Sequence, residues 1–444
     1  MQYLSLSGVL RIETTKYACI MKQNVKWMTI ALMMAAITVG CESGESSSIA
    51  EPTPNEPVTI EDNERQYIML NTAQIEMVNE SNNFAFNLFR QVASEESEIV
   101  SPISITYALG MLNNGAAGET QEQINKVLGF SKTGADGINE FCQKMLAEAP
   151  KLDKLTKVLI ANNIYFNSDK NYVLYPDFVN KAKLYYEADV ESRSFTDGQT
   201  MNVINQWASD HTEKMIDKVL DENSFNTSAA SYLLNAIYFK GTWSAKFETS
   251  NTQDETFHGY TAETTVPMMY QNSNFKYTET ADFQALRMPY GNGAYAMTIL
   301  LPKEEKTISD VLNTLTAKKW EMFQLMADAI VDVKLPRFES TSDITLNKIM
   351  ATLGMPNAFD IDLAEFPNFC PVDTYIGLMK QVAKIKLNEE GTEAAAVTVI
   401  AVNDKVSIEP EPMCVNFHAT RPFLYVISEQ STGAIFFIGQ YMGD

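Results

Sequence analysis

The sequence predicts an α+β fold: a helical N-terminal half followed by several β-strands. Between residues 79 and 128, apolar residues recur at the spacing of amphipathic helices. Later apolar runs are short and rich in β-branched and aromatic residues, as in strands. These strands and helices do not repeat as βαβ units, which indicates a mixed α+β domain. The chain has 444 residues, of which 45% are hydrophobic, enough for a sizeable core.

Residues 21–40 are predicted to be an export signal. Two lysines precede an apolar run over residues 27–39, and this run is too short to span a bilayer. Residues 1–20 show no such pattern, so we expect the true start of the chain at Met21.

The signal ends at Cys41, after a sequence that resembles a bacterial lipobox with Thr38 in place of the usual leucine. We therefore expect a lipid anchor on Cys41. It would hold the protein at the outer membrane or cell surface, or on the periplasmic face of a membrane. An ordinary signal peptide followed by an unrelated cysteine is the alternative. Ser, Glu and Pro are frequent after Cys41, which predicts a flexible tether over residues 41–70.

Three helices are predicted at the start of the folded domain. The first covers residues 79–92, where apolar side chains lie at helical spacing. Ser101-Pro102 opens a second helix that ends at Asn113-Asn114-Gly115, because proline is favoured at the first helical position and Asn or Gly at the end. Thr120 with Gln123 forms a capping box, which predicts the start of a third helix.

Strands dominate the rest of the chain. Asn292-Gly293 is a strong signal for a hairpin turn between two apolar runs. Two further helices are expected at residues 205–216 and 343–353. The predicted strands share a β-prone composition and cover residues 159–166, 232–239, 286–290, 296–301, 331–338 and 434–439.

The stretch from Glu389 to Asn403 combines small residues with the two-residue alternation of a strand. Gly391 adds backbone freedom at its start. No proline occurs before Pro410, so every residue can donate a backbone hydrogen bond to a neighbouring strand. The residues alone leave two interpretations open: a surface loop beside an ordinary strand, or a segment able to enter a sheet.

Composition and motifs argue against several classes of function. The net charge of −22 argues against binding to nucleic acid or to anionic lipid. After Cys41, three widely spaced cysteines remain, which predicts neither a disulfide framework nor a zinc site. Residues 291–296 match a loose dinucleotide fingerprint but lie in a predicted hairpin. No nucleophile elbow accompanies the three histidines, so we expect no enzyme, cofactor or metal site. The three cysteines are Cys142, Cys370 and Cys414.

Two motifs resemble the serpin family. One is the hinge of its reactive-centre loop, and the other is its signature near the C-terminus. Residues 100–104 and 114–120 are also similar to its N-terminal helices, and the resemblance extends over residues 79–439. It implies one serpin domain over residues 71–444, with a large mixed central sheet, further sheets and an exposed loop at about 389–412. The two motifs are Glu389-Glu390-Gly391-Thr392-Glu393-Ala394-Ala395-Ala396 and Phe417-His418-Ala419-Thr420-Arg421-Pro422-Phe423-Leu424.

The resemblance also implies two polar sites around the central sheet. The shutter lies beneath the sheet, and the breach lies at the top, where the loop first enters. Gln381 stands where the family usually has histidine, so an amide network there would lack pH sensitivity. The shutter residues are Ser101, Ser104, Asn235 and Gln381, and the breach residues are Trp243, Arg337 and Glu389.

The position of the bond that a protease would cleave follows from counting residues along the loop. The family's usual spacing of fourteen residues from the hinge glycine, Gly391, leads to the bond Lys405–Val406. Lysine there implies a trypsin-like target, since an ammonium group needs a carboxylate in the protease pocket. Because the loop is long, the specificity residue has three alternatives, and a valine would point to elastase-like targets. These are Val402, Asp404 and Val406.

The resemblance therefore implies a monomeric, exported and membrane-tethered inhibitor. It would form a covalent acyl-enzyme with serine endopeptidases and then insert its loop. A non-inhibitory serpin that acts as a binding module is the first alternative, although its hinge would be expected to carry bulky, charged or proline residues. Inhibition of elastase-like or cysteine proteases and a secreted hydrolase are the others.

Overall fold

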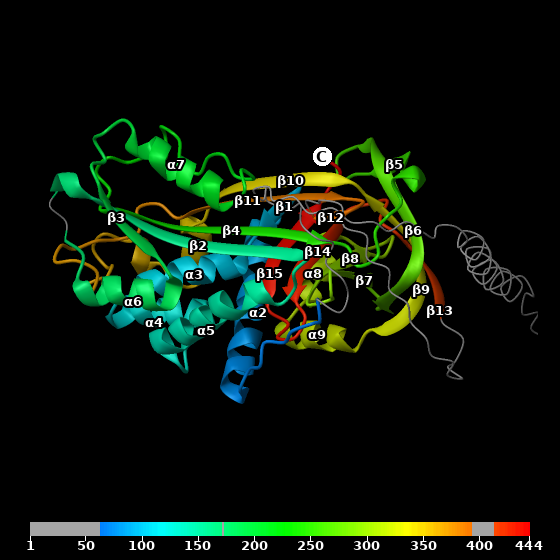
Figure 1. Ribbon diagram of the computed structural model, residues 1–444, viewed down its shortest axis with the longest axis horizontal. Helices are drawn as coiled ribbons and strands as arrows, with labels where there is room; N and C mark the ends of the chain where they lie inside the picture. The colour runs from blue at the N-terminus through cyan, green and yellow to red at the C-terminus, as the bar shows by residue number, and fades with distance from the viewer. Residues whose placement is uncertain (1–62, 171–172, 393–412) are drawn as a thin grey trace, which may run out of the picture.

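The computed structural model describes residues 63–170, 173–392 and 413–444. It confirms the predicted α+β class, with helices packed around two large sheets (Figure 1). The first, here called the central sheet, has six strands and contains both parallel and antiparallel pairs. Its order is β10 (Phe338–Thr345), β11 (Lys380–Asn388), β12 (Gly391–Thr392), β4 (Ser231–Thr242), β2 (Thr156–Asn167) and β3 (Asp189–Arg193).

The second sheet has nine strands and packs its apolar side chains into the main core. Strands β14, β15 and β8 are buried along their whole length. Its order is β1 (Glu98–Val100), β15 (Ile435–Tyr441), β14 (Phe423–Glu429), β8 (Tyr295–Pro302), β7 (Phe283–Tyr290), β6 (Glu263–Glu279), β9 (Ala327–Pro336) and β13 (Met413–His418), with β5 (Gln253–His258) paired to β6.

The helices cover the central sheet unevenly. Figure 1 shows α7 on one side of β2 and β4, and α3, α4, α5 and α6 on the other. Helices α8 and α9 lie near the end of the molecule that carries β6 and β9 (Figure 1). The helices are α2 (Thr72–Val92), α3 (Pro102–Asn113), α4 (Gly118–Val127), α5 (Gly134–Glu148), α6 (Pro176–Tyr186), α7 (Thr200–His211), α8 (Ile308–Thr314), α9 (Ala317–Met322) and α10 (Asn347–Leu353).

Local signals predicted several of these elements correctly. Helix α3 begins at Pro102 with Ser101 as its N-cap, and its hydroxyl accepts the Ser104 N–H. The hairpin between β7 and β8 turns at Asn292-Gly293, where Gly293 donates to the Tyr290 carbonyl at 2.7 Å. Caps and tight turns depend on a few adjacent residues, so the sequence shows them directly.

The predicted capping box of Thr120 and Gln123 is wrong. Helix α4 begins earlier, at Gly118, and Thr120 lies inside it. The Thr120 hydroxyl accepts the Glu365 N–H, while the Glu365 carboxylate accepts the Glu119 N–H at 2.8 Å. A residue far along the chain thus accepts a free N–H group in the first turn of this helix, in place of a local side-chain cap.

Three other boundaries differ from the predictions. The strand expected at residues 331–338 is two strands, β9 and β10, separated at Arg337. Residues 343–345, expected to be helical, extend β10 because they pair with β11, and α10 begins only at Asn347. The helix expected at 205–216 is α7, which ends at His211 before two residues of positive φ. Tertiary pairing overrides local helix propensity in the second case.

The packed body begins before residue 71. Within the predicted tether, Ile68 is buried and donates its N–H to the Ser431 hydroxyl at 2.9 Å. The Asn63 amide donates to the Asp153 carboxylate at 2.7 Å. Residues 63–70 therefore contact the body, which differs from the flexible segment expected over 41–70.

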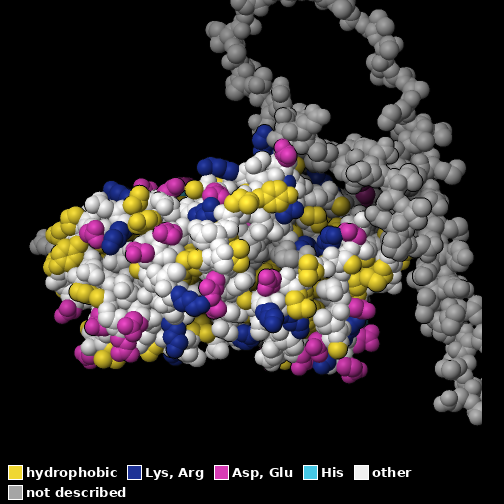
Figure 2. Space-filling view, turned by 90° about the horizontal axis from the view of Figure 1, so that it is seen from below, with side chains coloured by type: hydrophobic (Ala, Val, Ile, Leu, Met, Phe, Trp, Pro, Cys, Tyr) yellow, Lys and Arg dark blue, Asp and Glu magenta, His cyan; other side chains and the backbone are white. Residues whose placement is uncertain are grey.

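Two findings on the described residues bear on membranes and metals. None of the helices in residues 63–170, 173–392 and 413–444 is long and apolar enough to cross a bilayer. Over the same ranges, no three His, Cys, Asp or Glu side chains are grouped so as to hold a metal ion. Figure 2 shows one face of the molecule, on which acidic and basic side chains are interspersed.

Candidate functional site

The first residues of the predicted loop already lie inside the central sheet. Gly391 and Thr392 form β12, which pairs antiparallel with β11 on one side and with β4 on the other. Thr392 is only 2% exposed. The next hinge residues, Glu393, Ala394, Ala395 and Ala396, the bond Lys405–Val406 and the predicted lipidation site Cys41 lie outside the described residues.

A glycine at position 391 is required by the close approach of β4. Its φ is +145°, and a Cβ atom built on Gly391 would lie 2.0 Å from the Gly241 carbonyl oxygen. Any larger residue would therefore have to displace the backbone of β4. Gly391, the residue expected to give the loop backbone freedom, is thus also the residue that contacts the backbone of β4 closely.

Among the described residues, no strand lies between β11 and β4 below β12. Strands β11 and β4 are adjacent to β12 at its top, and below Thr392 no described strand pairs with their facing edges. A narrow cavity continues from Thr392 between these two strands. Its lining is largely apolar and comprises Ile99, Met215, Ile216, Ile237, Tyr238, Phe239, Lys384, Ile385, Thr392, Ile427 and Phe437.

Trp243 closes the top of the sheet, at the predicted breach. Its indole Nε1 donates to the Asn388 carbonyl at 3.0 Å, and its backbone N–H donates to the Glu390 carbonyl at 2.8 Å. The indole stacks on the ring of Tyr290, with centroids 4.4 Å apart and planes 8° apart. Tyr290 in turn lies 2.7 Å from Thr392, hydroxyl to hydroxyl. The sequence contained no signal that connects Tyr290 with the hinge.

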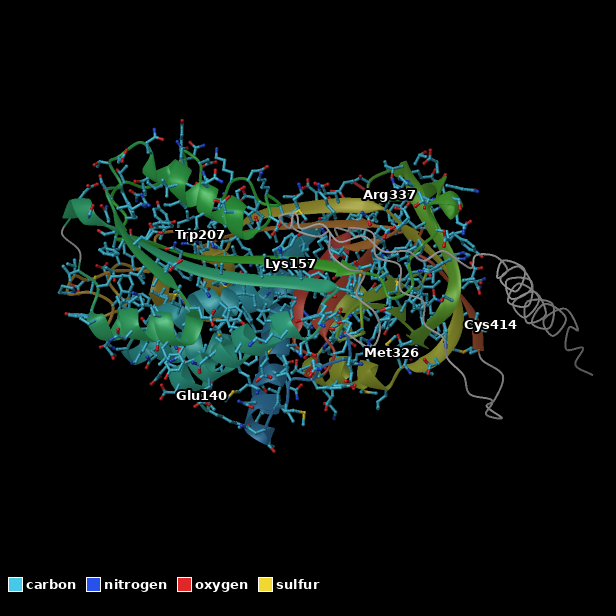
Figure 3. The ribbon with its side chains drawn as sticks, in the orientation of Figure 1. Glu140, Lys157, Trp207, Met326, Arg337 and Cys414 are labelled. Atoms are coloured by element: carbon cyan, nitrogen blue, oxygen red, sulfur yellow. The ribbon has the colours of Figure 1, made fainter. Side chains whose placement is uncertain are left out.

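The predicted pair Arg337 and Glu389 is formed beside Trp243. The guanidinium of Arg337 donates to both carboxylate oxygens of Glu389, once at 3.2 Å, and the Thr252 hydroxyl donates at 2.7 Å. Burial raises the pKa of Glu389, but these hydrogen bonds outweigh it and leave the pKa below its ordinary value. Figure 3 shows Arg337 at the same end of the molecule as Cys414 of β13. Arg337 and Thr252 therefore favour the ionised form of Glu389, which lies just before the hinge residues Gly391 and Thr392.

The four predicted shutter residues meet at the start of α3, where the Ser101 hydroxyl accepts the Ser104 N–H. The Gln381 side chain accepts the Ser101 N–H at 2.9 Å and donates to the Ser101 carbonyl at 3.0 Å. The Ser104 hydroxyl donates to Asn235, whose amide donates to Asn162 at 2.8 Å. Gln381 thus attaches β11 to α3, while Asn235 attaches β4 to the same helix.

The far end of the loop leads to the other sheet. Strand β13 begins at Met413 and pairs parallel with β9. The signature that follows is anchored by Phe417 and Phe423, both fully buried, and by Arg421, which donates to the Pro302 carbonyl at 3.1 and 2.6 Å. Residues 393–412 therefore connect the central sheet at Thr392 with an edge of the nine-stranded sheet.

Comparison with known proteins gives consistent matches. A family model described as "Serpin (serine protease inhibitor)" matches residues 79–443. Serpin B6 of Macaca fascicularis is 30% identical over 369 residues, which are 81% of this chain and 96% of the relative. The structure of a thermophilic serpin, tengpin, in the native state is 27% identical, with a TM-score of 0.75, and covers 85% of this chain and 96% of its own.

A structure of thyroxine-binding globulin in complex with thyroxine is also similar. It is 25% identical, has a TM-score of 0.72, and covers 83% of this chain and 99% of its own.

Proposed function

The chain belongs to the serpin family, and we propose that it is a suicide-substrate inhibitor of trypsin-like serine endopeptidases. One observation carries the proposal: Gly391 and Thr392 are already paired on both sides, directly above a stretch of β11 and β4 between which no described strand lies. Insertion of a reactive loop into a β-sheet is known for serpins. In this chain, the residues after Thr392 have the alternation and the small side chains that such a position needs.

The proposed reaction begins as ordinary proteolysis. The protease serine attacks the carbonyl carbon of Lys405, an ester bond to the enzyme forms, and the Lys405–Val406 peptide bond breaks. The amino group of Val406 leaves with the proton that the protease histidine transfers. The segment that ends at Lys405 is then free to extend β12 between β11 and β4. Each added ladder hydrogen bond contributes about 1 kcal/mol net, so ten of them suffice to drag the bound protease.

The experiment is a protease panel. Wild-type protein incubated with trypsin-like, elastase-like and cysteine proteases should give a covalent complex on denaturing gels with the trypsin-like enzymes. We predict that Lys405→Ala weakens this trapping by orders of magnitude, because the protease pocket then loses its ionic partner. Val402→Ala, a change in the same loop, is the matched control and should trap normally. Mass spectrometry should identify Val406 as the first residue of the released peptide.

Other outcomes would point to other functions. A released peptide that begins at Asn403, Lys405 or Ser407 would move the specificity residue to Val402, Asp404 or Val406. A chain that is cleaved without forming a complex with any protease would contradict the inhibitor proposal and favour the binding module. The similarity to thyroxine-binding globulin makes this a concrete alternative, but the alanines at positions 394–396 favour insertion. Turnover of a substrate by the protein would indicate a hydrolase.

A further inference from the structure

We propose that Tyr290 is a positioning residue that latches Thr392 in the central sheet before any protease acts. This inference rests on the proposed function and adds to it. According to this inference, the Tyr290 hydroxyl controls how readily the loop begins to insert. The two residues are far apart in sequence, and Tyr290 belongs to the nine-stranded sheet, whereas Thr392 belongs to the central sheet.

The contact joins two hydroxyl groups in a site closed to water. Tyr290 is fully buried and Thr392 is 2% exposed, and their oxygens lie 2.7 Å apart, so either group can donate. A buried hydroxyl without a hydrogen-bond partner is destabilising. Each hydroxyl therefore makes the burial of the other favourable, and the pair stabilises the inserted position of Thr392.

The tyrosine ring is held in place by residues of β4 and by Trp243, which follows β4 directly. Trp243 stacks on one face of Tyr290, and Phe239 packs edge-on with centroids 5.2 Å apart. Gly241 leaves room for the ring, because a Cβ atom there would lie 2.7 Å from it. Gly241 is also the residue of β4 that pairs with Thr392. The hydroxyl of Tyr290 is thus directed at the Thr392 side chain by Phe239 and Gly241 of β4 and by Trp243.

A hinge that is already paired lowers the entropy cost of starting insertion after cleavage. Ordering the first residues of a strand costs conformational entropy before later hydrogen bonds compensate for it. In the uncleaved protein, this cost is already met at Gly391 and Thr392. After cleavage, the loop extends an existing strand, so insertion competes well with hydrolysis of the acyl-enzyme. Loss of the latch should delay the start of insertion and send more molecules along the substrate route.

The first test uses uncleaved protein and no protease. Hydrogen–deuterium exchange of the peptide that contains Gly391 and Thr392 should become about tenfold faster in Tyr290→Phe, the factor expected for loss of one buried hydrogen bond. Thr392→Val should give a similar increase. Tyr295→Phe is the matched control: Tyr295 is also fully buried, but its hydroxyl donates to the Ala149 carbonyl at 2.8 Å. This control should leave exchange at the hinge unchanged.

The double variant Tyr290→Phe with Thr392→Val separates a direct contact from two independent effects. With both hydroxyls removed, no buried group is left unpaired, so the double variant should exchange no faster than either single variant. Additive effects would overturn the latch. Exchange at the hinge equal to that of wild type in both single variants would overturn it as well. Thr392→Val keeps the test valid should Tyr290→Phe fail to fold.

The second test measures how many inhibitor molecules are consumed for each protease trapped. This ratio should rise about fivefold or more in Tyr290→Phe and remain at the wild-type value in Tyr295→Phe, while the rate of loop cleavage stays the same. Wild-type protein that traps no protease would contradict the proposed function, and the exchange experiment would still decide on the latch. Normal trapping by Tyr290→Phe, with unchanged exchange, would contradict the latch alone.

Discussion

Glu389 and Gln381 are buried polar residues on β11 or just after it, and the structure satisfies them differently. Glu389 is ionised and accepts hydrogen bonds from Arg337 and Thr252. Gln381 is neutral and binds the backbone of Ser101 through both ends of its amide. A carboxylate anchor depends on pH, whereas an amide anchor does not. The two ends of β11 should therefore respond differently to acid.

The first prediction concerns Glu389 and acid. Because hydrogen bonds lower its pKa in the folded state, its contribution to stability is present above the ordinary value of 4.5 and is lost as the pH falls through the folded pKa. We expect Glu389→Gln to remove part of the fall in melting temperature that wild type shows between about pH 5 and pH 3. Glu390→Gln is the control, since its partner Lys246 forms a more exposed ion pair. Identical acid profiles for wild type and Glu389→Gln would contradict the prediction.

A second prediction introduces pH sensitivity at the shutter. In Gln381→His, only a neutral imidazole nitrogen would accept the Ser101 N–H, so protonation breaks this contact. The folded pKa of the new histidine should lie below its unfolded value of about 6.5, and stability should fall as the pH drops through that region. Melting temperatures between about pH 8 and pH 5 measure this. Wild type provides the comparison, and an unchanged profile in the variant would show that Ser101 does not depend on residue 381.

At the scale of elements, the two-residue strand β12 separates β11 from β4. Both of its residues, Gly391 and Thr392, are paired on both sides. The two strands on either side of it are attached separately to α3, through Gln381 and through Asn235. The Ser101 hydroxyl accepts the Ser104 N–H, so the two attachments meet at the start of α3 and tie both strands to the same helix.

The element-scale prediction is that Thr392→Arg makes the proposed inhibitor behave as an ordinary substrate. The position is 2% exposed, and an unpaired guanidinium there would cost several kcal/mol. The variant should be cleaved at the same bond as wild type, yet form no stable complex and gain no heat resistance on cleavage. Denaturing gels and melting curves measure both effects. Glu393→Arg is the control, because alternation along a strand turns position 393 to the other face. Normal trapping by Thr392→Arg would exclude hinge insertion.

At the scale of the whole molecule, the N-terminal segment contacts the body close to Tyr290, the residue that contacts Thr392 of the hinge. Asn63 binds Asp153, and Asp153 also accepts the backbone N–H of Asn292 in the turn that follows Tyr290. Asn63 therefore lies beside the turn that follows Tyr290. We propose that residues 41–62 connect this point to a lipid anchor on Cys41, which would place the inhibitor at a membrane surface.

The corresponding prediction is that mature wild-type protein partitions into the detergent phase and that Cys41→Ser does not. The physical reason is that a lipidated cysteine adds long acyl chains, which supply membrane affinity that a polar tether lacks. Detergent phase separation and the mass of the N-terminal peptide measure it. Cys142→Ser is the control, since Cys142 is buried in the body. Full membrane association of Cys41→Ser would reject the anchor.

Local sequence was sufficient for the α+β class, the hairpin at Asn292-Gly293 and the start of α3. Turn and cap signals act over a few residues, and hydrophobic spacing reports the period of each element. The resemblance to the serpin family also came from sequence motifs, and the family model that matches residues 79–443 confirmed the family. These features share one property: the residues that specify them are neighbours in the chain.

Contacts between distant residues were decided only by the tertiary structure. The start of α4 depends on Glu365, and the strand at residues 343–345 depends on pairing with β11. The attachment of Gln381 and Asn235 to the start of α3, the pairing of Thr392 between β11 and β4, and its contact with Tyr290 belong to the same class. A hydroxyl or carboxylate can stabilise the hinge only when the fold buries it beside a hydrogen-bond partner. The position of that partner cannot be predicted from periodicity or from a local motif, because the two residues are distant in the chain.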